Sequence, residues 1–316
     1  MKILVTGATG FIGAAVADRL KGDGHDVVCL VRKTSKTVDL EKKGFYLVEG
    51  DIVFPQTLAK VFGEVRPEAV FHCAARVWDD DEEGLLRDNG EGTQNVCEAC
   101  YGYGVKRLVY LSSVAVVSGN EDVPLTDDLE YKASDAYGRS KIEAERAAIL
   151  YREKGLNVSI IRPCIVYGED EPHAFDGILN AIAKKRVPVL DVSGMDSKLN
   201  LVYLGNVVQA AMLAFEKEEA LEGTFMVADR EVITLRKFVE ILADEIYSGR
   251  PMVIPGWLVR AAMIIPLLRR KAKRYFKDRV YDISRAEDIL GYDPEVSTEE
   301  GFRRTVRYWK RKRSRE

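Results

Sequence analysis

The chain contains 316 residues, of which 47% are apolar and 31% are charged, and its formal net charge is −3. This length is sufficient to bury a large core. The slightly acidic balance excludes the broadly basic surface that nonspecific nucleic-acid binding requires. The longest uninterrupted apolar run, at 261–268, is far shorter than the ~20 residues that span a bilayer. We therefore expect a globular protein without an embedded span.

The N-terminus begins directly as an apolar strand, without a charged leader or a cleavage site, which predicts a cytoplasmic protein. The odd number of cysteines, five, agrees with reduced thiols in that compartment. Cys97 and Cys100 form a C-x-x-C pattern, but neither a second such pair nor a histidine cluster accompanies it. We predict that both cysteines pack on a helix and that the protein binds no metal.

Residues 1–31 have the pattern of a β-α-β unit. An apolar strand leads into Gly7, Gly10 and Gly13, a helix follows as far as about residue 22, and a second strand covers 27–31. A pyrophosphate can approach the backbone at the helix N-terminus, where free N–H groups and the helix dipole attract an anion. A side chain at Gly7 or Gly10 would obstruct this turn, and Gly13 allows the helix to pack closely. Between a strand and a helix, this triplet is a strong signal for a dinucleotide site.

The end of the second strand bears on the choice between NAD and NADP. An acidic residue usually stands there in NAD sites and binds the ribose hydroxyls. This chain instead has Arg32, Lys33, Ser35 and Lys36, which suit the 2′-phosphate of NADP. The alternative is a solvated basic loop. We predict NADP as the cofactor, with NAD as the second choice.

Strands continue to alternate with helices through the first half of the chain. This pattern predicts an α/β fold, a doubly wound parallel Rossmann sheet with a smaller α/β substrate domain on its C-terminal side. Ligands of such sheets bind at the carboxyl ends of the strands. The residues expected at those ends are Gly7, Asp51, Ala74, Ser113 and Pro163.

The motifs TGATGFIG, GDI, HCAA, YLSS, YGRSK and RPCIVYG occur in the order and spacing of the extended short-chain dehydrogenase/reductases. The chain resembles this superfamily over essentially its whole length. Within it, the chain is most similar to the NAD(P)-dependent sugar epimerases and related dihydroflavonol-reductase-like and 3β-hydroxysteroid-dehydrogenase-like enzymes. The resemblance implies cofactor contacts from Gly7, Thr9, Gly10, Phe11, Ile12, Gly13, Arg32, Lys33, Ser35, Asp51, Ile52, Ala74, Ala75, Tyr137, Lys141, Pro163 and Ile165.

The resemblance further implies that Tyr137 is the general acid/base, with Lys141 as its partner and Ser113 as the third member of the site. Tyr137 and Lys141 are one helical turn apart, so they share a face. An ammonium beside the phenol, together with an oxidised nicotinamide, would lower the tyrosine pKa from about 10. Lys141 would also hold the ribose hydroxyls, and Ser113 would bind the substrate oxygen. Ser112 is the competing serine.

Two further residues match family positions with less defined roles. Asn89 is expected to shape the active site or to cap the start of a helix, and Arg162 is expected to be structural. The segment Leu204-Gly205-Asn206-Val207 departs from the family pattern near the expected substrate side, as does VVSG at 116–119. These departures leave the Ser-Tyr-Lys set intact but weaken any transfer of a specific substrate.

The expected Rossmann domain covers 1–167, with 200–222 returning to it, and the substrate domain covers 168–199 and 223–316. An apolar stretch and a basic run at 257–277 could contact an anionic membrane surface. His173 is expected to be a surface residue. Arg186 and Arg279 are candidates to bind a substrate pyrophosphate.

Three functions follow from these expectations. The first is an oxidoreductase or epimerase acting on a nucleotide-sugar-like substrate, and the second is an NADP-dependent reductase or dehydrogenase of a sterol, isoprenoid or flavonol-like alcohol. The third, of another class, is a non-catalytic dinucleotide-sensing regulator, which the Tyr-Lys pair disfavours. The resemblance also implies a homodimer, formed through the helix of Tyr137 and the helix that follows Gly92.

Overall fold

The structure is a computed structural model that describes residues 1–77, 79–121, 123–172, 175–184, 187–247, 251–262 and 277–314. Its larger lobe is built on a seven-stranded sheet of order β11-β6-β5-β4-β1-β2-β3, in which every pair of neighbours is parallel. The predicted doubly wound Rossmann sheet is confirmed. The strands are β1 (Lys2–Thr6), β2 (Asp26–Val31), β3 (Tyr46–Glu49), β4 (Ala69–His72), β5 (Arg107–Leu111), β6 (Val158–Pro163) and β11 (Thr224–Val227).

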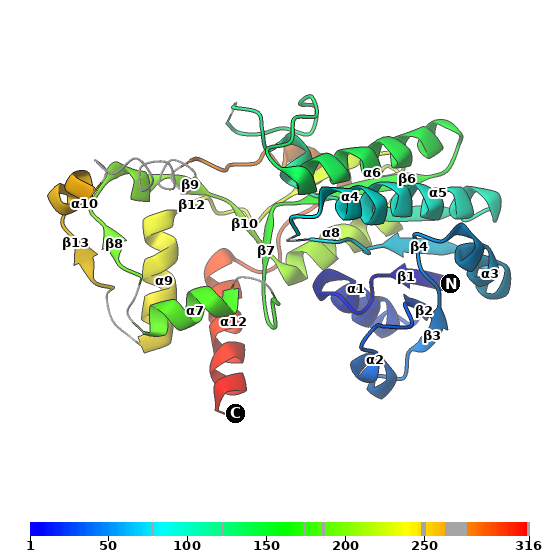
Figure 1. Ribbon diagram of the computed structural model, residues 1–316, viewed down its shortest axis with the longest axis horizontal. Coiled ribbons are helices and arrows are strands. Elements are labelled where there is room, and N and C mark those ends of the chain that lie inside the picture. The colour runs from blue at the N-terminus through cyan, green and yellow to red at the C-terminus, as the bar shows by residue number, and fades with distance from the viewer. Residues whose placement is uncertain are drawn as a thin grey trace.

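Helices cover both faces of this sheet because its inner strands are almost wholly apolar and buried on both sides. One face carries α3 (Pro55–Val65), α5 (Gly92–Gly102) and α6 (Ala136–Glu153), which pack in that order. The other carries α1 (Phe11–Gly22) and α8 (Leu204–Glu216). The short helix α2 (Val38–Lys42) joins β2 to β3. Figure 1 shows these two layers to the right.

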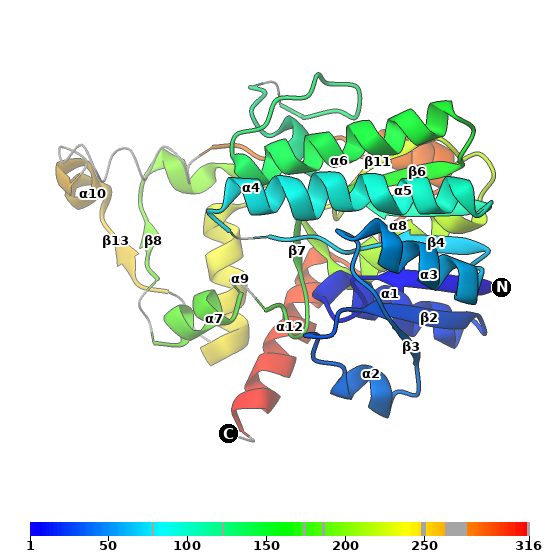
Figure 2. The ribbon, with the colours of Figure 1, turned by 45° about the vertical axis from the view of Figure 1, so that its right-hand side comes forward.

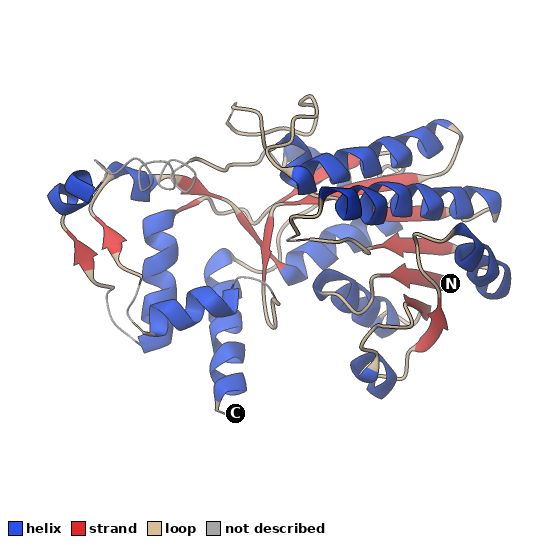
Figure 3. Ribbon diagram, viewed as in Figure 1, coloured by secondary structure: helices blue, strands red, loops and turns tan. Residues whose placement is uncertain are grey.

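The sheet has its topological switch point at β1, which pairs with β2 on one side and with β4 on the other. The chain winds outward from β1 to β3 and then crosses back to β4, β5 and β6. In such sheets the ligand binds outside the carboxyl ends of the strands at this point. The loops after these strands all open toward the smaller lobe, as the strand arrows in Figure 3 show.

The smaller lobe lies beside those strand ends, to the left in Figures 1 and 2. It has its own aromatic core, in which Tyr167, Phe175 and Phe302 pack against one another. Two strands, β7 (Ile165–Tyr167) and β10 (Leu201–Tyr203), pair in parallel where the lobes meet. The other elements are α7 (Phe175–Ala183), β8 (Val189–Leu190), β9 (Lys198–Leu199), β12 (Ile233–Thr234), α9 (Leu235–Tyr247), β13 (Val253–Ile254), α10 (Gly256–Ala262) and α12 (Thr298–Arg313).

Two segments that the prediction assigned to the substrate domain pack with the larger lobe. Strand β11, which falls in the segment assigned to the substrate domain, is the edge strand of the main sheet beside β6. Leu290 and Tyr292 also belong to the core that lies between the sheet, α1 and α8. Burial of these apolar side chains draws two late segments of the chain back onto the larger lobe.

Candidate active site

The glycine turn after β1 leaves no room for side chains. Gly7 has φ +71°, and a Cβ there would lie 2.6 Å from the backbone nitrogen of Ala74. A Cβ on Gly13 would lie 2.2 Å from the carbonyl oxygen of Gly7. Gly13 therefore lets helix α1 approach the turn closely. Such a turn fits a dinucleotide pyrophosphate, which needs close access to backbone N–H groups.

Helix α1 points its N-terminus into this turn. Gly10 is the N-cap and offers no side chain to the free N–H groups of the first helical turn. Thr9 and Gly10 are exposed, and Phe11 and Ile12 are half-buried. The backbone donors of this turn are thus open to an anion, which the helix dipole attracts.

The loop after β2, the strand that pairs with β1, presents positive charge beside this turn. Arg32 and Lys33 are exposed, and neither forms an ion pair with any residue in the described ranges. The turn is closed by Ser35, whose hydroxyl accepts a bond from the Arg32 N–H at 3.0 Å. Asp51 follows β3, where its carboxylate accepts a bond from the Val53 N–H at 3.1 Å. The predicted residues therefore do gather at the ends of these strands.

Ser113 and Tyr137 meet where β5 and α6 come together. Ser113 follows β5 and caps a 3₁₀ turn at Val114–Val117, accepting a bond from the Ala115 N–H at 3.2 Å. Its side chain also hydrogen-bonds Tyr137, which lowers the pKa of that phenol. Burial outweighs this bond and raises that pKa to about 12. The protein groups alone therefore favour the neutral phenol.

Lys141 is buried one helical turn after Tyr137, and only 1% of the residue is exposed. Its Nζ donates to the Leu111 carbonyl at 2.8 Å and lies 4.6 Å from the ring centre of Tyr110. Burial lowers the pKa of Lys141 to about 7. A cation held this way at the end of β5 can favour a phenolate on Tyr137 and can donate to ribose hydroxyls.

Ser112 has a different environment, which favours Ser113 as the reacting serine. Its side chain is buried, and its hydroxyl donates to Glu145 at 2.5 Å. Glu145 also receives a bidentate ion pair from Arg162, with the shortest contact at 2.7 Å. Arg162 is therefore structural, as expected. Glu145 was not among the predicted residues. Its position four residues after Lys141 on the same helical face is a feature of the sequence that would have indicated a contact between the two.

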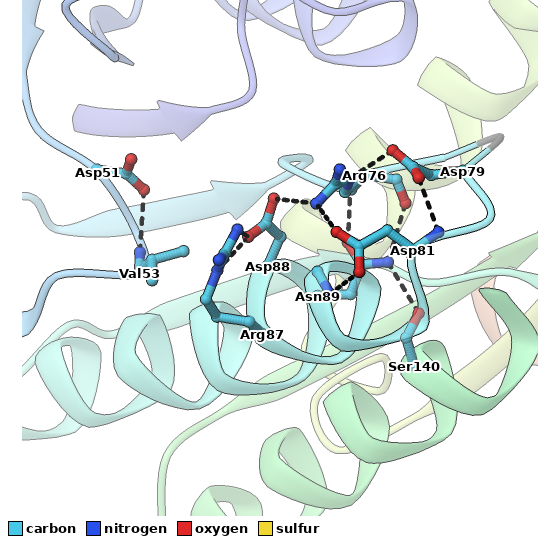
Figure 4. A network of polar contacts seen from close by, with 10 residues as sticks. Asp51, Val53, Arg76, Asp79, Asp81, Arg87, Asp88, Asn89 and Ser140 are labelled. Atoms are coloured by element: carbon cyan, nitrogen blue, oxygen red, sulfur yellow. Dashed lines mark hydrogen bonds and ion pairs between the residues drawn. The ribbon is translucent and has the colours of Figure 1, made fainter. Parts of the chain in front are cut away.

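Asn89 joins the loop after β4 to helix α6. It lies within the π-helical segment Leu86–Glu91, so the prediction of a helix-start cap was wrong. Its amide exchanges two hydrogen bonds with the backbone of Arg76 and donates to Ser140 at 2.9 Å. The Arg76 guanidinium is in turn paired with Asp79 at 2.8 Å, in the network of Figure 4. This network was not predicted, and it sets the course of the chain beside Ala74 and Ala75.

The remaining predicted residues differ in their exposure to solvent. Pro163 ends β6 and is buried, whereas Ile165 is 41% exposed. Arg279 is half-buried and pairs with no carboxylate in the described part of the chain. Asn206 lies away from solvent, because its amide bonds Asp229 and the Val296 backbone. His173 and Arg186 lie outside the described residues.

The C-x-x-C pair belongs to the core. Cys97 and Cys100 are buried on α5, and burial raises the pKa of both thiols. Within the described ranges, no cluster of three or more His, Cys, Asp or Glu side chains could hold a metal ion. Over the same ranges, no helix combines the length and the apolar character needed to cross a bilayer.

Comparison with known proteins shows what this chain is similar to. The NAD dependent epimerase/dehydratase family matches residues 3–228. A UDP-glucose 4-epimerase of Vibrio cholerae is 30% identical, over 96% of this chain and 94% of its own. A 2-alkyl-3-oxoalkanoate reductase of Stenotrophomonas maltophilia is 28% identical, over 96% and 98%. The structure of a Thermotoga maritima UDP-glucose 4-epimerase with UDP-glucose covers 99% of both chains at 26% identity, with a TM-score of 0.82.

Proposed function

Because the chain belongs to the NAD dependent epimerase/dehydratase family, an enzyme family, we propose that it transfers a hydride at a hydroxyl or keto carbon. The reacting set is Ser113, Tyr137 and Lys141. The observation that carries this proposal is the buried Lys141 ammonium, one helical turn from a phenol that Ser113 also bonds. A non-catalytic regulator would have no use for a desolvated cation at this point.

The roles of the three side chains follow from their positions. Ser113 donates its O–H to the substrate oxygen when the substrate is bound, and holds that oxygen beside Tyr137. Tyr137 takes the proton from a hydroxyl, or gives it to a keto oxygen, as that oxygen changes charge. Lys141 stabilises the phenolate and binds the ribose. The nicotinamide, when bound, accepts or supplies the hydride.

We propose NADP as the preferred nucleotide within this NAD(P)-dependent class. Arg32 and Lys33 are exposed at the end of β2 and have no carboxylate partner in the described ranges, so they suit a 2′-phosphate. An acid that could bind the 2′-hydroxyl does not directly follow β2. NAD, which the family description names, is the alternative.

The substrate we propose first is nucleotide-sugar-like. Arg279 supports it, because a half-buried guanidinium without a carboxylate partner in the described ranges suits a pyrophosphate. The name of the 30%-identical relative, UDP-glucose 4-epimerase, is consistent with this class. A second candidate is an apolar alcohol or ketone. The exposed Ile165 at the mouth of the site and the name of the reductase relative favour it.

The proposal is tested on freshly purified, undialysed protein and on a Tyr137→Phe variant. Retained NAD(P), identified by absorbance and mass after denaturation, favours epimerisation, since that cycle keeps the cofactor bound. Empty protein that binds added NADP⁺ favours a dehydrogenase or reductase. Tyr137→Phe should bind cofactor within about threefold of the wild type but lose at least about a hundredfold in turnover. Equal turnover by both proteins would refute the proposed chemistry.

We also propose a homodimer through α5 and α6. Their outward faces include the exposed Tyr101 and Leu150, and a shallow groove lies at the N-terminal end of α6. The residues that line this groove are Glu82, Leu86, Arg139, Ile142, Glu143 and Arg146. Light scattering should give the mass of two chains, and Tyr101→Glu with Leu150→Glu should give the mass of one.

We also propose that the segment 257–277, at the tip of the smaller lobe, contacts lipid. Trp257 and Leu258 on α10 are 64% and 43% exposed, which supports it. Residues 263–276 of this segment lie outside the described ranges. Sedimentation with vesicles containing phosphatidylglycerol should carry the wild type down and leave Trp257→Glu in solution. Vesicles of phosphatidylcholine alone, which carry no net charge, serve as the control for the contribution of the lipid charge.

A further inference from the structure

A carboxylate without solvent exposure lies one helical turn beyond Lys141. Glu145 is 0% exposed, yet each of its oxygens receives several hydrogen bonds. Oε1 accepts from Ser112 at 2.5 Å, and Oε2 accepts from the Tyr131 hydroxyl at 2.7 Å. The Arg162 guanidinium contacts both oxygens, at 3.0 and 2.7 Å. A buried carboxylate is costly unless it is paired and bonded in this way.

The partners of Glu145 come from three segments, two of which adjoin the proposed reacting groups Ser113 and Tyr137. Ser112 directly precedes Ser113 at the end of β5. Arg162 directly precedes Pro163 at the end of β6, and its Nη1 donates to the Asp127 carbonyl at 2.9 Å. Tyr131 belongs to the loop that leads into α6 and Tyr137. One carboxylate thus links both strand ends to the helix.

Glu145 also acts on the charge of Lys141. The side chains packed around the Lys141 ammonium include Tyr110 of β5, and His72 and Cys73 at the end of β4. Burial lowers the pKa of His72 to about 3 and raises that of Cys73 to about 12, so both are neutral near pH 7. Glu145 raises the pKa of Lys141 against the larger effect of burial.

We propose that Glu145 is a positioning residue, which keeps Lys141 charged and holds the end of β5 in register with the catalytic helix. This inference rests on the proposed function, because it concerns the same Ser113, Tyr137 and Lys141. It adds a fourth group that touches neither substrate nor cofactor. The Arg162 guanidinium weakens the effect of Glu145 on Lys141, because it neutralises part of the negative charge of the Glu145 carboxylate.

The direction in which two substitutions change the Tyr137 pKa distinguishes this role from a purely packing role. Glu145→Gln removes the negative charge and leaves Arg162 unpaired, and both changes disfavour the Lys141 ammonium. A neutral Lys141 no longer stabilises the phenolate, so the Tyr137 pKa rises. Glu145 lies about 12 Å along the helix from Tyr137, twice as far as Lys141, so its direct effect is the smaller one. Arg162→Met frees the carboxylate to act on Lys141, and the Tyr137 pKa falls or stays unchanged.

The measurement is a phenolate absorbance titration between about pH 6 and pH 10 with saturating NADP⁺, and with NAD⁺ in parallel. Subtracting the curve of Tyr137→Phe isolates one phenolate and needs no substrate. We expect Glu145→Gln to reduce the phenolate fraction near pH 7 about tenfold, a shift of about one pKa unit. Arg162→Met should not reduce the phenolate fraction. If Glu145→Gln fails to fold, the titration of Arg162→Met is the test of the inference.

Asp229→Asn is the matched control. Asp229 is also a buried carboxylate, bonded by Tyr167, Asn206 and the Tyr203 N–H, but it lies on the side of the smaller lobe. Its substitution should lower stability without moving the phenolate titration. The inference is overturned when Glu145→Gln titrates like the wild type, or when both ion-pair variants raise the pKa alike. A wild type without any phenolate below the ordinary tyrosine range would overturn the proposed function as well.

Discussion

Replacing Gly7 by alanine tests the geometry of the cofactor turn directly. Gly7 has φ +71°, a region that costs a residue with a side chain about 1–2 kcal/mol. The new Cβ would also lie 2.6 Å from the Ala74 nitrogen and 2.7 Å from its Cα, both backbone atoms that cannot rotate away. Overpacking of this kind costs about 1–3 kcal/mol. Together these effects predict a loss of about 2–5 kcal/mol in the free energy of unfolding.

The matched control is Gly22→Ala at the other end of the same helix. A Cβ at Gly22 meets no atom within 4 Å, and its φ is not positive. We expect it to be neutral or to stabilise by up to about 1 kcal/mol, since alanine favours the helix. Urea unfolding measures both variants.

Cofactor affinity, measured by titration with NADPH fluorescence, is the second assay. Relief of the Gly7→Ala clash must move the turn away from Ala74, and the backbone donors around the pyrophosphate move with it. We expect at least about tenfold weaker binding for Gly7→Ala and no change for Gly22→Ala. The reasoning is refuted if Gly7→Ala unfolds within about 0.5 kcal/mol of Gly22→Ala and binds NADPH equally well.

Three further substitutions test other parts of the structure. Asn89→Ala removes the three hydrogen bonds of a buried amide and should destabilise by about 2–3 kcal/mol in urea, whereas the half-buried Asn157→Ala, which loses one bond, should cost under about 1 kcal/mol. The folded pKa of Lys141, about 7, lies below its ordinary value, so wild-type stability should rise from about pH 7 toward pH 10, by up to about 1.4 kcal/mol per pH unit. Lys141→Met should remove that rise, and an equally steep profile in the variant would contradict the assignment. Arg32→Ala should weaken NADP⁺ about tenfold and NAD⁺ less than twofold, and equal losses for both would speak against a 2′-phosphate contact.

The features that could be predicted from the sequence are those that depend on neighbouring residues. The glycine turn, the apolar strands and the Tyr137–Lys141 pair are local patterns, because helical and strand periodicity fixes which side chains share a face. The alternation of strands and helices then predicts the parallel sheet, and with it the row of strand ends around the cofactor groove. The fold class and the family were accessible on this basis.

The tertiary structure decided what depends on contacts between distant segments. Periodicity places Glu145 beside Lys141, but only the packing of α6 against β5 and β6 buries both and brings Arg162 to the carboxylate. Asn89 carries no local sign that it bonds the Arg76 backbone, and β11 carries none that it joins the main sheet. Such pairings are selected by burial, since a buried polar group needs a partner wherever the fold supplies one. The charge on Lys141 follows from the same burial, which no spacing in the sequence encodes.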